Sequence, residues 1–179
     1  MQEYAITVIG RDRPGIIADV TGILAGLNLN LTDSTMTRLR GHFAMTLICA
    51  GIAGTAAQEV DASAIEAALG PITADGSLVA AVRELGAEPE ETAEGGHFVL
   101  SLHGADRLGI VAAVARLLAD VDGNVTDLTT RLTGELYVLV AEVDLPSGVD
   151  VAALSDRLRL TAAVLGVEAN LRAADVDLL

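Results

Sequence analysis

The sequence predicts an α+β protein made of two similar domains, each with the element order β-α-β-β-α-β. Three observations support this. The segment from Ile6 to Cys49 recurs from Leu100 to Val140. Apolar residues alternate along the expected strands, and they recur every three or four positions along the expected helices. A chain of 179 residues therefore suits two units of roughly 90 residues each, which are too small to hold large cores.

The repeat extends to individual polar residues. Nine residues recur unchanged 94 positions later, namely Gly10, Asp12, Arg13, Gly15, Ile16, Asn30, Thr32, Asp33 and Thr35. Beyond Thr35 the copy is expected to drop one residue, which matches Arg38, Leu39 and Gly41 to Arg131, Leu132 and Gly134. Two such units in one chain are able to form a pseudo-two-fold pair, and the seam of that pair is a candidate ligand site.

The first domain is expected to begin with a half-buried strand at Glu3–Ile9. A polar loop follows, and Pro14 suits the first position of a helix, where its missing N–H costs nothing. That helix has one apolar face, formed by Ile16, Val20, Ile23, Leu24 and Leu27. Two strands joined at Arg40–Gly41 come next. A second helix capped by Asp61 and broken or kinked by Pro71 precedes the last strand.

The second domain repeats this order. Its first helix has apolar residues at the same spacing, namely Ile110, Val114, Leu117, Leu118 and Val121. A turn is expected at Thr133–Gly134, and a second helix is expected to start at Asp150 and end at Gly166. The simplest fold with this order is the ferredoxin-like sandwich, a four-stranded antiparallel sheet with two helices on one face. The expected domains are residues 1–86 and 97–179, joined by an acidic linker at 87–96.

Composition excludes several classes of function. The formal net charge is −14, and all eleven basic residues are Arg, so neither a Schiff-base lysine nor a P-loop lysine exists. Acidic charge and an aromatic content of 2% argue against direct nucleic-acid binding. The single cysteine, Cys49, has no disulfide partner and lies in an apolar strand pattern. No signal peptide or membrane span is recognisable, so a cytoplasmic protein without membrane contact is expected.

One set of residues resembles a known family. Val8–Ile16 has the sequence V-I-G-R-D-R-P-G-I, and it is followed by Asn30 and by Gly41–Met45. This pattern resembles the ACT domain, and the tandem arrangement resembles the glycine cleavage system transcriptional repressor group. The resemblance covers the chain outside the linker, although the second copy has Leu108 in place of Pro14. It implies a regulatory, non-catalytic protein that binds amino acids between paired ACT units and acts through a partner protein.

The residues of the repeated turn suit an amino acid. Its carboxylate needs convergent N–H donors, which a helix start at Gly15 and Ile16 supplies together with the positive end of the helix dipole. Its ammonium needs acceptors such as Asn30 and Asp12. The predicted ligand-binding set, with the neighbouring turn residues included, is Asp12, Arg13, Pro14, Gly15, Ile16, Asn30, Asp106, Leu108, Gly109, Ile110 and Asn124.

Each of these residues also has a purely structural interpretation. Gly15 suits any tight strand-to-helix turn, and Asp12 suits a helix start. Arg13 and its copy Arg107 suit surface ion pairs, and both asparagines suit turns at strand entries. No metal or cofactor is predicted, because the spacing of the three histidines, His42, His97 and His103, does not suit metal ligation. No catalytic residue is predicted, because no nucleophile-elbow pattern and no catalytic carboxylate pair are recognisable. His42 is expected in solvent, and His103 is a weak candidate for the second pocket.

The leading interpretation is an amino-acid sensor that modulates a transcription regulator of glycine metabolism, with glycine or serine suggested by the resemblance. Two alternatives stay open: an interaction module that binds no ligand, and the regulatory subunit of an amino-acid metabolic enzyme. The expected partners are the amino acid and a regulatory protein or metabolic enzyme, with no nucleic acid. A homodimer is also expected, because the cores are small and the sheets have edge strands, although pairing of the two units within one chain would satisfy the edge as well.

Overall fold

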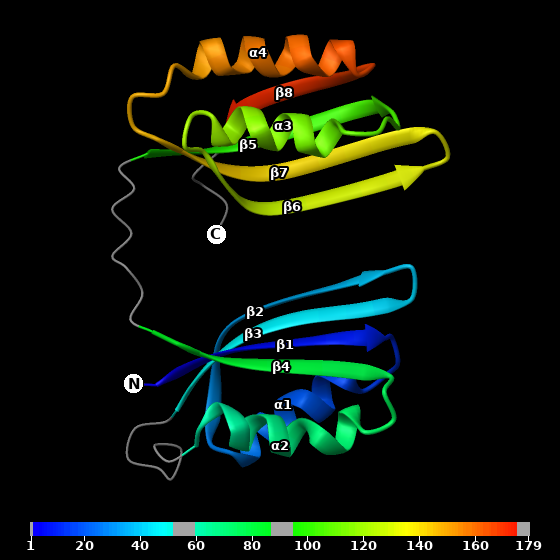
Figure 1. Ribbon diagram of the computed structural model, residues 1–179, viewed down its shortest axis with the longest axis vertical. Coiled ribbons are helices and arrows are strands. Elements are labelled where there is room, and N and C mark those ends of the chain that lie inside the picture. Colours follow the sequence, from blue (N-terminus) through cyan, green and yellow to red (C-terminus); the bar gives the residue numbers. More distant parts are fainter. Residues whose placement is uncertain (1, 52–59, 87–94, 175–179) are drawn as a thin grey trace. The chain divides into compact units, whose positions relative to one another are not determined.

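The computed structural model describes residues 2–51, 60–86 and 95–174. The chain divides into two compact units, Met1–Glu90 and Glu91–Leu179, called unit 1 and unit 2 below. In each unit two helices cover one face of a four-stranded antiparallel sheet (Figure 1). The two ferredoxin-like units predicted from the repeat are therefore confirmed.

The elements of unit 1 are β1 (Glu3–Arg11), α1 (Ile16–Gly26), β2 (Leu29–Leu39), β3 (His42–Gly51), α2 (Ala62–Thr73) and β4 (Leu78–Leu85). Its strands are ordered β2-β3-β1-β4. Those of unit 2 are β5 (Gly95–Ala105), α3 (Ile110–Ala119), β6 (Asn124–Thr133), β7 (Leu136–Pro146), α4 (Val151–Val164) and β8 (Val167–Ala173). The order β6-β7-β5-β8 repeats that of unit 1.

The structure describes only the last two residues of the predicted linker at 87–96. Residues 87–94 lie outside the described residues. The last two residues assigned to the linker, Gly95 and Gly96, form the start of β5 and pair with Pro146 and Leu145. A Cβ at Gly95 would lie 2.2 Å from the Leu145 carbonyl oxygen, so the absence of a side chain lets this strand end approach β7 closely.

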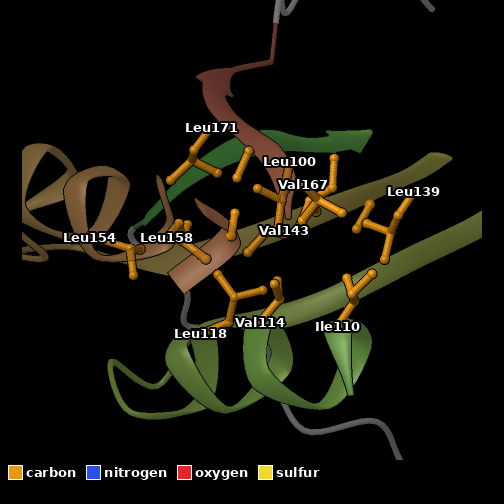
Figure 2. Packing of buried hydrophobic residues seen from close by; sticks show 14 of the residues in the cluster. Leu100, Ile110, Val114, Leu118, Leu139, Val143, Leu154, Leu158, Val167 and Leu171 are labelled. Atoms are coloured by element: carbon orange, nitrogen blue, oxygen red, sulfur yellow. The ribbon is translucent and has the colours of Figure 1, made fainter. Parts of the chain in front are cut away.

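Each core lies between the sheet and its helices and is mainly aliphatic, with Tyr4 and Phe43 as the buried aromatic residues of unit 1. In β1 the inward residues Tyr4, Ile6 and Val8 are fully buried. The predicted apolar faces of the two first helices are confirmed, because Ile16, Val20 and Leu24 of α1 are buried, as are Ile110, Val114 and Leu118 of α3. Figure 2 shows the α3 residues packed against β7, β8 and α4 of unit 2.

The predicted caps of the second helices are also confirmed. The Asp61 carboxylate accepts a hydrogen bond from the Ala64 amide at 2.7 Å, and Asp150 accepts one from Ala153 at 2.9 Å. Gly166 follows the end of α4 with a positive φ of 73°, the conformation expected at such an end. Pro71 does not end α2, since the helix continues to Thr73.

The prediction that the second copy lacks one residue after the counterpart of Thr35 is wrong. Arg38 pairs with Phe43 in unit 1, and Leu132 pairs with Tyr137 in unit 2, so the offset of 94 continues through both hairpins. The turns are Arg40–Gly41 and, one residue later than predicted, Gly134–Glu135. Arg40 and Gly41 both have positive φ, whereas in the second turn only Gly134 does. Two positive φ values are typical of a type I′ turn, whereas a single positive φ at the first turn residue is typical of type II′, which favours glycine at that position. Glycine therefore comes second in the turn of unit 1 and first in the turn of unit 2.

The expected position of Pro14 is also wrong. Helix α1 begins at Ile16, and Gly15 occupies the position just before it with φ 90°, so Pro14 lies in the turn before the helix. The left-handed conformation of Gly15 redirects the chain, and the helix starts only after it. In unit 2 Gly109 has φ 92° at the same place. Within the described part of the chain, no helix is long and apolar enough to cross a membrane.

Candidate ligand-binding site at the strand-to-helix turns

The turn between β1 and α1 forms a depression in the surface of unit 1. Its volume is about 510 Å³, and residues 12–18 line it together with Met36 and Phe43. The five members of the predicted set that belong to this turn, Asp12, Arg13, Pro14, Gly15 and Ile16, are therefore brought together. Ile16 itself is 1% exposed, so its side chain belongs to the core and only its backbone is available to a ligand.

Unit 2 has the same depression at the turn between β5 and α3. Its volume is about 600 Å³, and residues 106–112 line it together with Tyr137. Asp106, Leu108, Gly109 and Ile110 of the predicted set meet here. Among the described residues no side chain caps either α1 or α3. The first-turn amides of both helices thus keep the donor capacity and positive end that favour a carboxylate.

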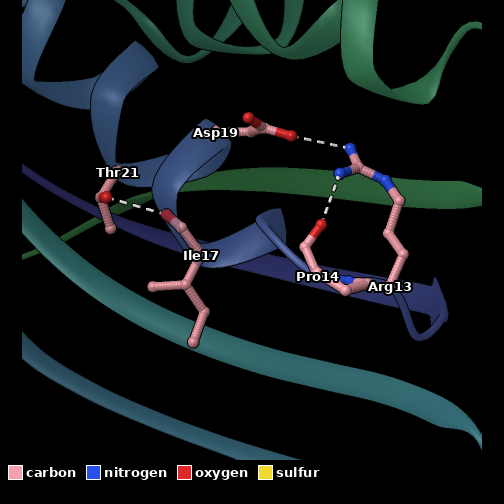
Figure 3. A network of polar contacts seen from close by, with 5 residues as sticks. All are labelled: Arg13, Pro14, Ile17, Asp19 and Thr21. Carbon is pink, nitrogen blue, oxygen red and sulfur yellow. Dashed lines mark hydrogen bonds and ion pairs between the residues drawn. The ribbon is translucent and has the colours of Figure 1, made fainter.

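The charged residues of the unit 1 turn are paired within the protein. The Arg13 guanidinium donates to the Asp19 carboxylate at 2.8 Å and to the Pro14 carbonyl at 3.2 Å, so it folds over the turn (Figure 3). Asp12 accepts a hydrogen bond from Arg38 at 3.3 Å. The Asp12 amide also donates to the Gly41 carbonyl at 3.0 Å, which ties the turn to the β2–β3 hairpin. Arg13 therefore forms the surface ion pair that was considered as its structural role.

The two asparagines lie away from these turns. Asn30 pairs with Ala50, and Ala50 pairs with Glu3 at the start of β1. The Gly15 turn follows the other end of β1, roughly 25 Å away at about 3.3 Å per residue. Asn124 lies in the same way, since it pairs with Asp144 and Asp144 pairs with His97 near the start of β5. No single unit therefore combines its glycine turn with its asparagine.

Three lining residues from outside the turns and helix starts were not predicted as part of the site: Met36, Phe43 and Tyr137. Phe43 pairs with Gly10, and Tyr137 pairs with Gly104, so each aromatic ring lies beside the strand end from which the turn departs. The sequence contained a usable signal, because both aromatics alternate inward and both follow a hairpin turn. Without the register, however, nothing placed them opposite those glycines.

The histidines and the cysteine lie outside the two depressions. His97 contacts Asp144 at 2.5 Å and His103 contacts Glu168 at 3.4 Å, while His42 is exposed. His103, a weak candidate for the second pocket, does not line it. Burial raises the pKa of the Cys49 thiol, which disfavours its reactive thiolate form. In the described ranges no three His, Cys, Asp or Glu residues are placed to hold a metal ion.

Comparison with known proteins identifies the family. The ACT domain family matches the chain twice, at residues 4–70 and 96–172. The chain belongs to the ACT-domain family. The two matches fall on the two units, so it is a tandem ACT-domain protein.

Similar proteins include short archaeal ones. UPF0237 protein MJ1558 of Methanocaldococcus jannaschii is 32% identical over 79 residues, which cover 44% of this chain and 88% of that protein. UPF0237 protein MK1213 of Methanopyrus kandleri is 46% identical over 48 residues, or 27% of this chain. The chain spans about half the length of that relative, 53%.

Two solved structures resemble the whole chain. An unknown protein from Galdieria sulphuraria is 25% identical with a TM-score of 0.78, and the match covers 97% of this chain and 99% of the other. A putative glycine cleavage system transcriptional repressor is 18% identical with a TM-score of 0.69, over 97% and 98% of the two chains. At that identity the second likeness concerns the fold alone.

Proposed function

We propose that this tandem ACT-domain protein binds a free amino acid at its strand-to-helix turns and thereby regulates a partner protein. The observation that carries the proposal is the repetition of one exposed turn in both units. Each turn has a left-handed glycine, an uncapped helix start and a depression large enough for a small ligand. Family membership supports the same ligand class, because ACT domains typically bind amino acids.

The chemistry of each turn suits a carboxylate. The amides that follow Gly15 and Gly109 point out of the helix start, where charge-assisted hydrogen bonds to an anion are favourable. Because neither glycine has a side chain, the ligand reaches the backbone without obstruction. Asn30 and Asn124 are not part of the proposed sites, because each lies at the opposite end of its own sheet from the glycine turn.

The regulatory part of the proposal rests on the resemblance to the two-ACT repressor group. A cytoplasmic, homodimeric protein that modulates a transcription regulator of glycine metabolism fits this resemblance. Ligand binding would act by stabilising one arrangement of the protein over another. One observation favours the alternative of an interaction module for unit 1 alone: Arg13 covers its turn and is held there by Asp19.

A thermal-shift screen of the full chain against the twenty common amino acids, followed by calorimetry, tests ligand binding. The informative variants add a carboxylate beside each turn, Ile17→Glu and Val111→Glu, where the exposed fractions are 44% and 38%. Repulsion of the ligand carboxylate should weaken binding, while a glutamate in the first helical turn should not unfold the helix. Leu160→Glu, at a site 70% exposed on α4, is the matched control.

The proposal predicts a rise in melting temperature with at least one amino acid at millimolar concentration. It also predicts that this rise shrinks in one or both turn variants but persists in the Leu160→Glu protein. A folded protein that gains no stability from any of the twenty amino acids would contradict it. Equal loss in all three variants would contradict the assignment of the site to the turns.

A further inference from the structure

The two turns carry the same charged residues in different surroundings. The constant offset of 94 makes Asp106 and Arg107 the counterparts of Asp12 and Arg13. By the same offset, the counterpart of Asp19 in α1 is Ala113 in α3. The strand register makes Leu132 the counterpart of Arg38, because these residues pair with Tyr137 and Phe43. Unit 2 thus kept the two turn charges and lost both of their partners.

A nearby carboxylate of unit 1 is missing from unit 2 as well. Asp75 precedes β4, and its pKa is lowered first by the hydrogen bonds from Ser77 and also by the nearby positive charge of Arg13. Leu78 pairs with Gly10 and Val167 pairs with Gly104, so the position of Asp75 corresponds to Val164 in unit 2. In unit 1 Arg13 therefore pairs with Asp19 and lies near Asp75, whereas the matching positions of unit 2 hold an alanine and a valine.

The side chains follow this difference. In unit 1 a Cβ placed on Gly15 would lie 3.8 Å from Nη1 of Arg13, so the guanidinium covers the glycine. In unit 2 a Cβ placed on Gly109 would meet no atom within 4 Å. The Arg107 side chain instead lies near Gly166, where a Cβ would be 4.0 Å from its Nε atom. Among the described residues, Asp106 and Arg107 have no ion-pair partner, and both are exposed.

We propose that the unit 2 turn is the one that binds the zwitterion, with Arg107 pairing the ligand carboxylate and Asp106 pairing its ammonium. The unit 1 turn is neutralised by its own side chains and binds the same ligand more weakly. This inference rests on the function proposed above and deepens it, because it names the competent site and the two side chains that select a doubly charged ligand.

The physical reason is competition. A ligand at the unit 1 turn must displace or share Arg13, which already donates to Asp19 and to the Pro14 carbonyl. At the unit 2 turn Arg107 and Asp106 each gain an oppositely charged group of the ligand and lose only hydrogen bonds to water. Charge-assisted hydrogen bonds to a carboxylate are among the stronger polar contacts, and a guanidinium offers two parallel donors for them. The unpaired arginine therefore contributes affinity that the paired arginine does not.

Calorimetry on the full chain with each of the twenty amino acids as probe tests this inference. Arg107→Gln and Arg13→Gln form a matched pair, since both change an exposed turn residue in the same way. The expected result is that Arg107→Gln weakens binding about tenfold while Arg13→Gln changes it less than about twofold, as loss of a bidentate charge pair implies. Acetate and methylammonium, each with one of the two charges, should bind far more weakly than the amino acid.

A second experiment changes the surroundings of Arg107 and includes its own control. Ala113→Asp gives Arg107 the partner that Arg13 has, and it should weaken binding about fivefold. Asp156→Ala, which removes the exposed partner of Arg159, should leave binding unchanged. Melting temperatures of all variants check folding.

A ligand-free readout uses phenylglyoxal, which modifies accessible guanidinium groups. Peptide mapping should show Arg107 reacting several-fold faster than Arg13, and the bound amino acid should protect Arg107.

Arg13→Gln weakening binding as much as Arg107→Gln, or equal reactivity of the two arginines, would overturn the inference while leaving amino-acid binding intact. A folded wild-type protein that binds none of the twenty amino acids would overturn the proposed function itself, and this inference with it.

Discussion

The carboxylate of Asp12 lies 3.3 Å from the guanidinium of Arg38, although 26 positions separate the two residues. Asp12 follows β1 and Arg38 lies near the end of β2, so the pair connects the first turn to the hairpin beyond it. Exposure of the side chains is 28% for Asp12 and 70% for Arg38. Solvent therefore screens the pair, and its role is to position the turn more than to stabilise the fold.

A double-mutant cycle measures this pair. Asp12→Asn, Arg38→Gln and the double variant should give a coupling free energy of about 0.5 kcal/mol in urea unfolding, as for other exposed pairs. The coupling should fall at high salt because of screening. A coupling above about 2 kcal/mol, a size typical of buried charge networks, would contradict this account of a solvent-screened pair.

Gly15→Ala should destabilise unit 1 by about 1 kcal/mol, because alanine is strained at φ 90°. The Cβ itself would meet nothing closer than 3.8 Å, so the effect comes from the backbone alone. Gly22→Ala is the matched control: it lies within α1, has open space around it and should stabilise by about 0.5–1 kcal/mol through helix propensity. Urea unfolding of both variants checks the sign, and a stabilising Gly15→Ala would refute the left-handed turn.

Gly10→Ala should be more damaging than Gly15→Ala. A Cβ at Gly10 would lie 2.1 Å from the Ser77 carbonyl oxygen, which already accepts the Arg11 amide at 2.9 Å. Relief of this overlap requires β1 and the turn before β4 to separate, at a cost of about 3 kcal/mol or more. Gly26→Ala, where no atom lies within 4 Å, provides the comparison. Similar unfolding free energies for the two variants would show that the close approach does not exist.

The Tyr4 phenol makes the free energy of unfolding depend on pH in the alkaline range. Its hydroxyl donates to the Val60 carbonyl, and its pKa is raised from 10.0 by burial first and then by Glu84 and Asp61. Since the unfolded state releases this proton at lower pH than the folded state, stability should fall as pH rises above about 10. Tyr4→Phe should cost about 1 kcal/mol at pH 7.

The same variant provides the control for the pH effect. Phenylalanine does not titrate, so the difference in unfolding free energy between wild type and Tyr4→Phe should shrink as pH rises from 9 to 11. Denaturant unfolding across that range measures it. A constant difference would mean that the Tyr4 phenol titrates alike in both states.

The fold was largely predictable from the sequence because periodicity reports burial directly. Tyr4, Ile6 and Val8 alternate in the sequence and are buried together, and the caps at Asp61 and Asp150 form the expected hydrogen bonds. The two wrong predictions, the start of α1 and the position of the second hairpin turn, concern places where the backbone conformation of a glycine determines the structure. Glycine in the left-handed region displaced the start of α1 past Pro14, and a different hairpin turn moved Gly134 relative to its copy.

The site was predictable only in its local part. Residues adjacent in sequence, such as Asp12 and Gly15, necessarily meet in one turn. The relation of Asn30 to that turn depends on strand order, because β3 separates β2 from β1 and the register places Asn30 beside Ala50. Single-sequence patterns do not contain this information, and they equally did not reveal that Asp19 and Arg38 neutralise the first turn.

An amide NMR titration of the full chain tests the central claim, amino-acid binding at the strand-to-helix turns, most directly. On addition of each amino acid the account predicts that the amide signals of Gly109 and Ile110 shift most, those of Gly15 and Ile16 less, and those of the α2 and α4 helix centres not at all. Saturable shifts confined to residues outside both turns, or no shift with any amino acid in the folded protein, would contradict it.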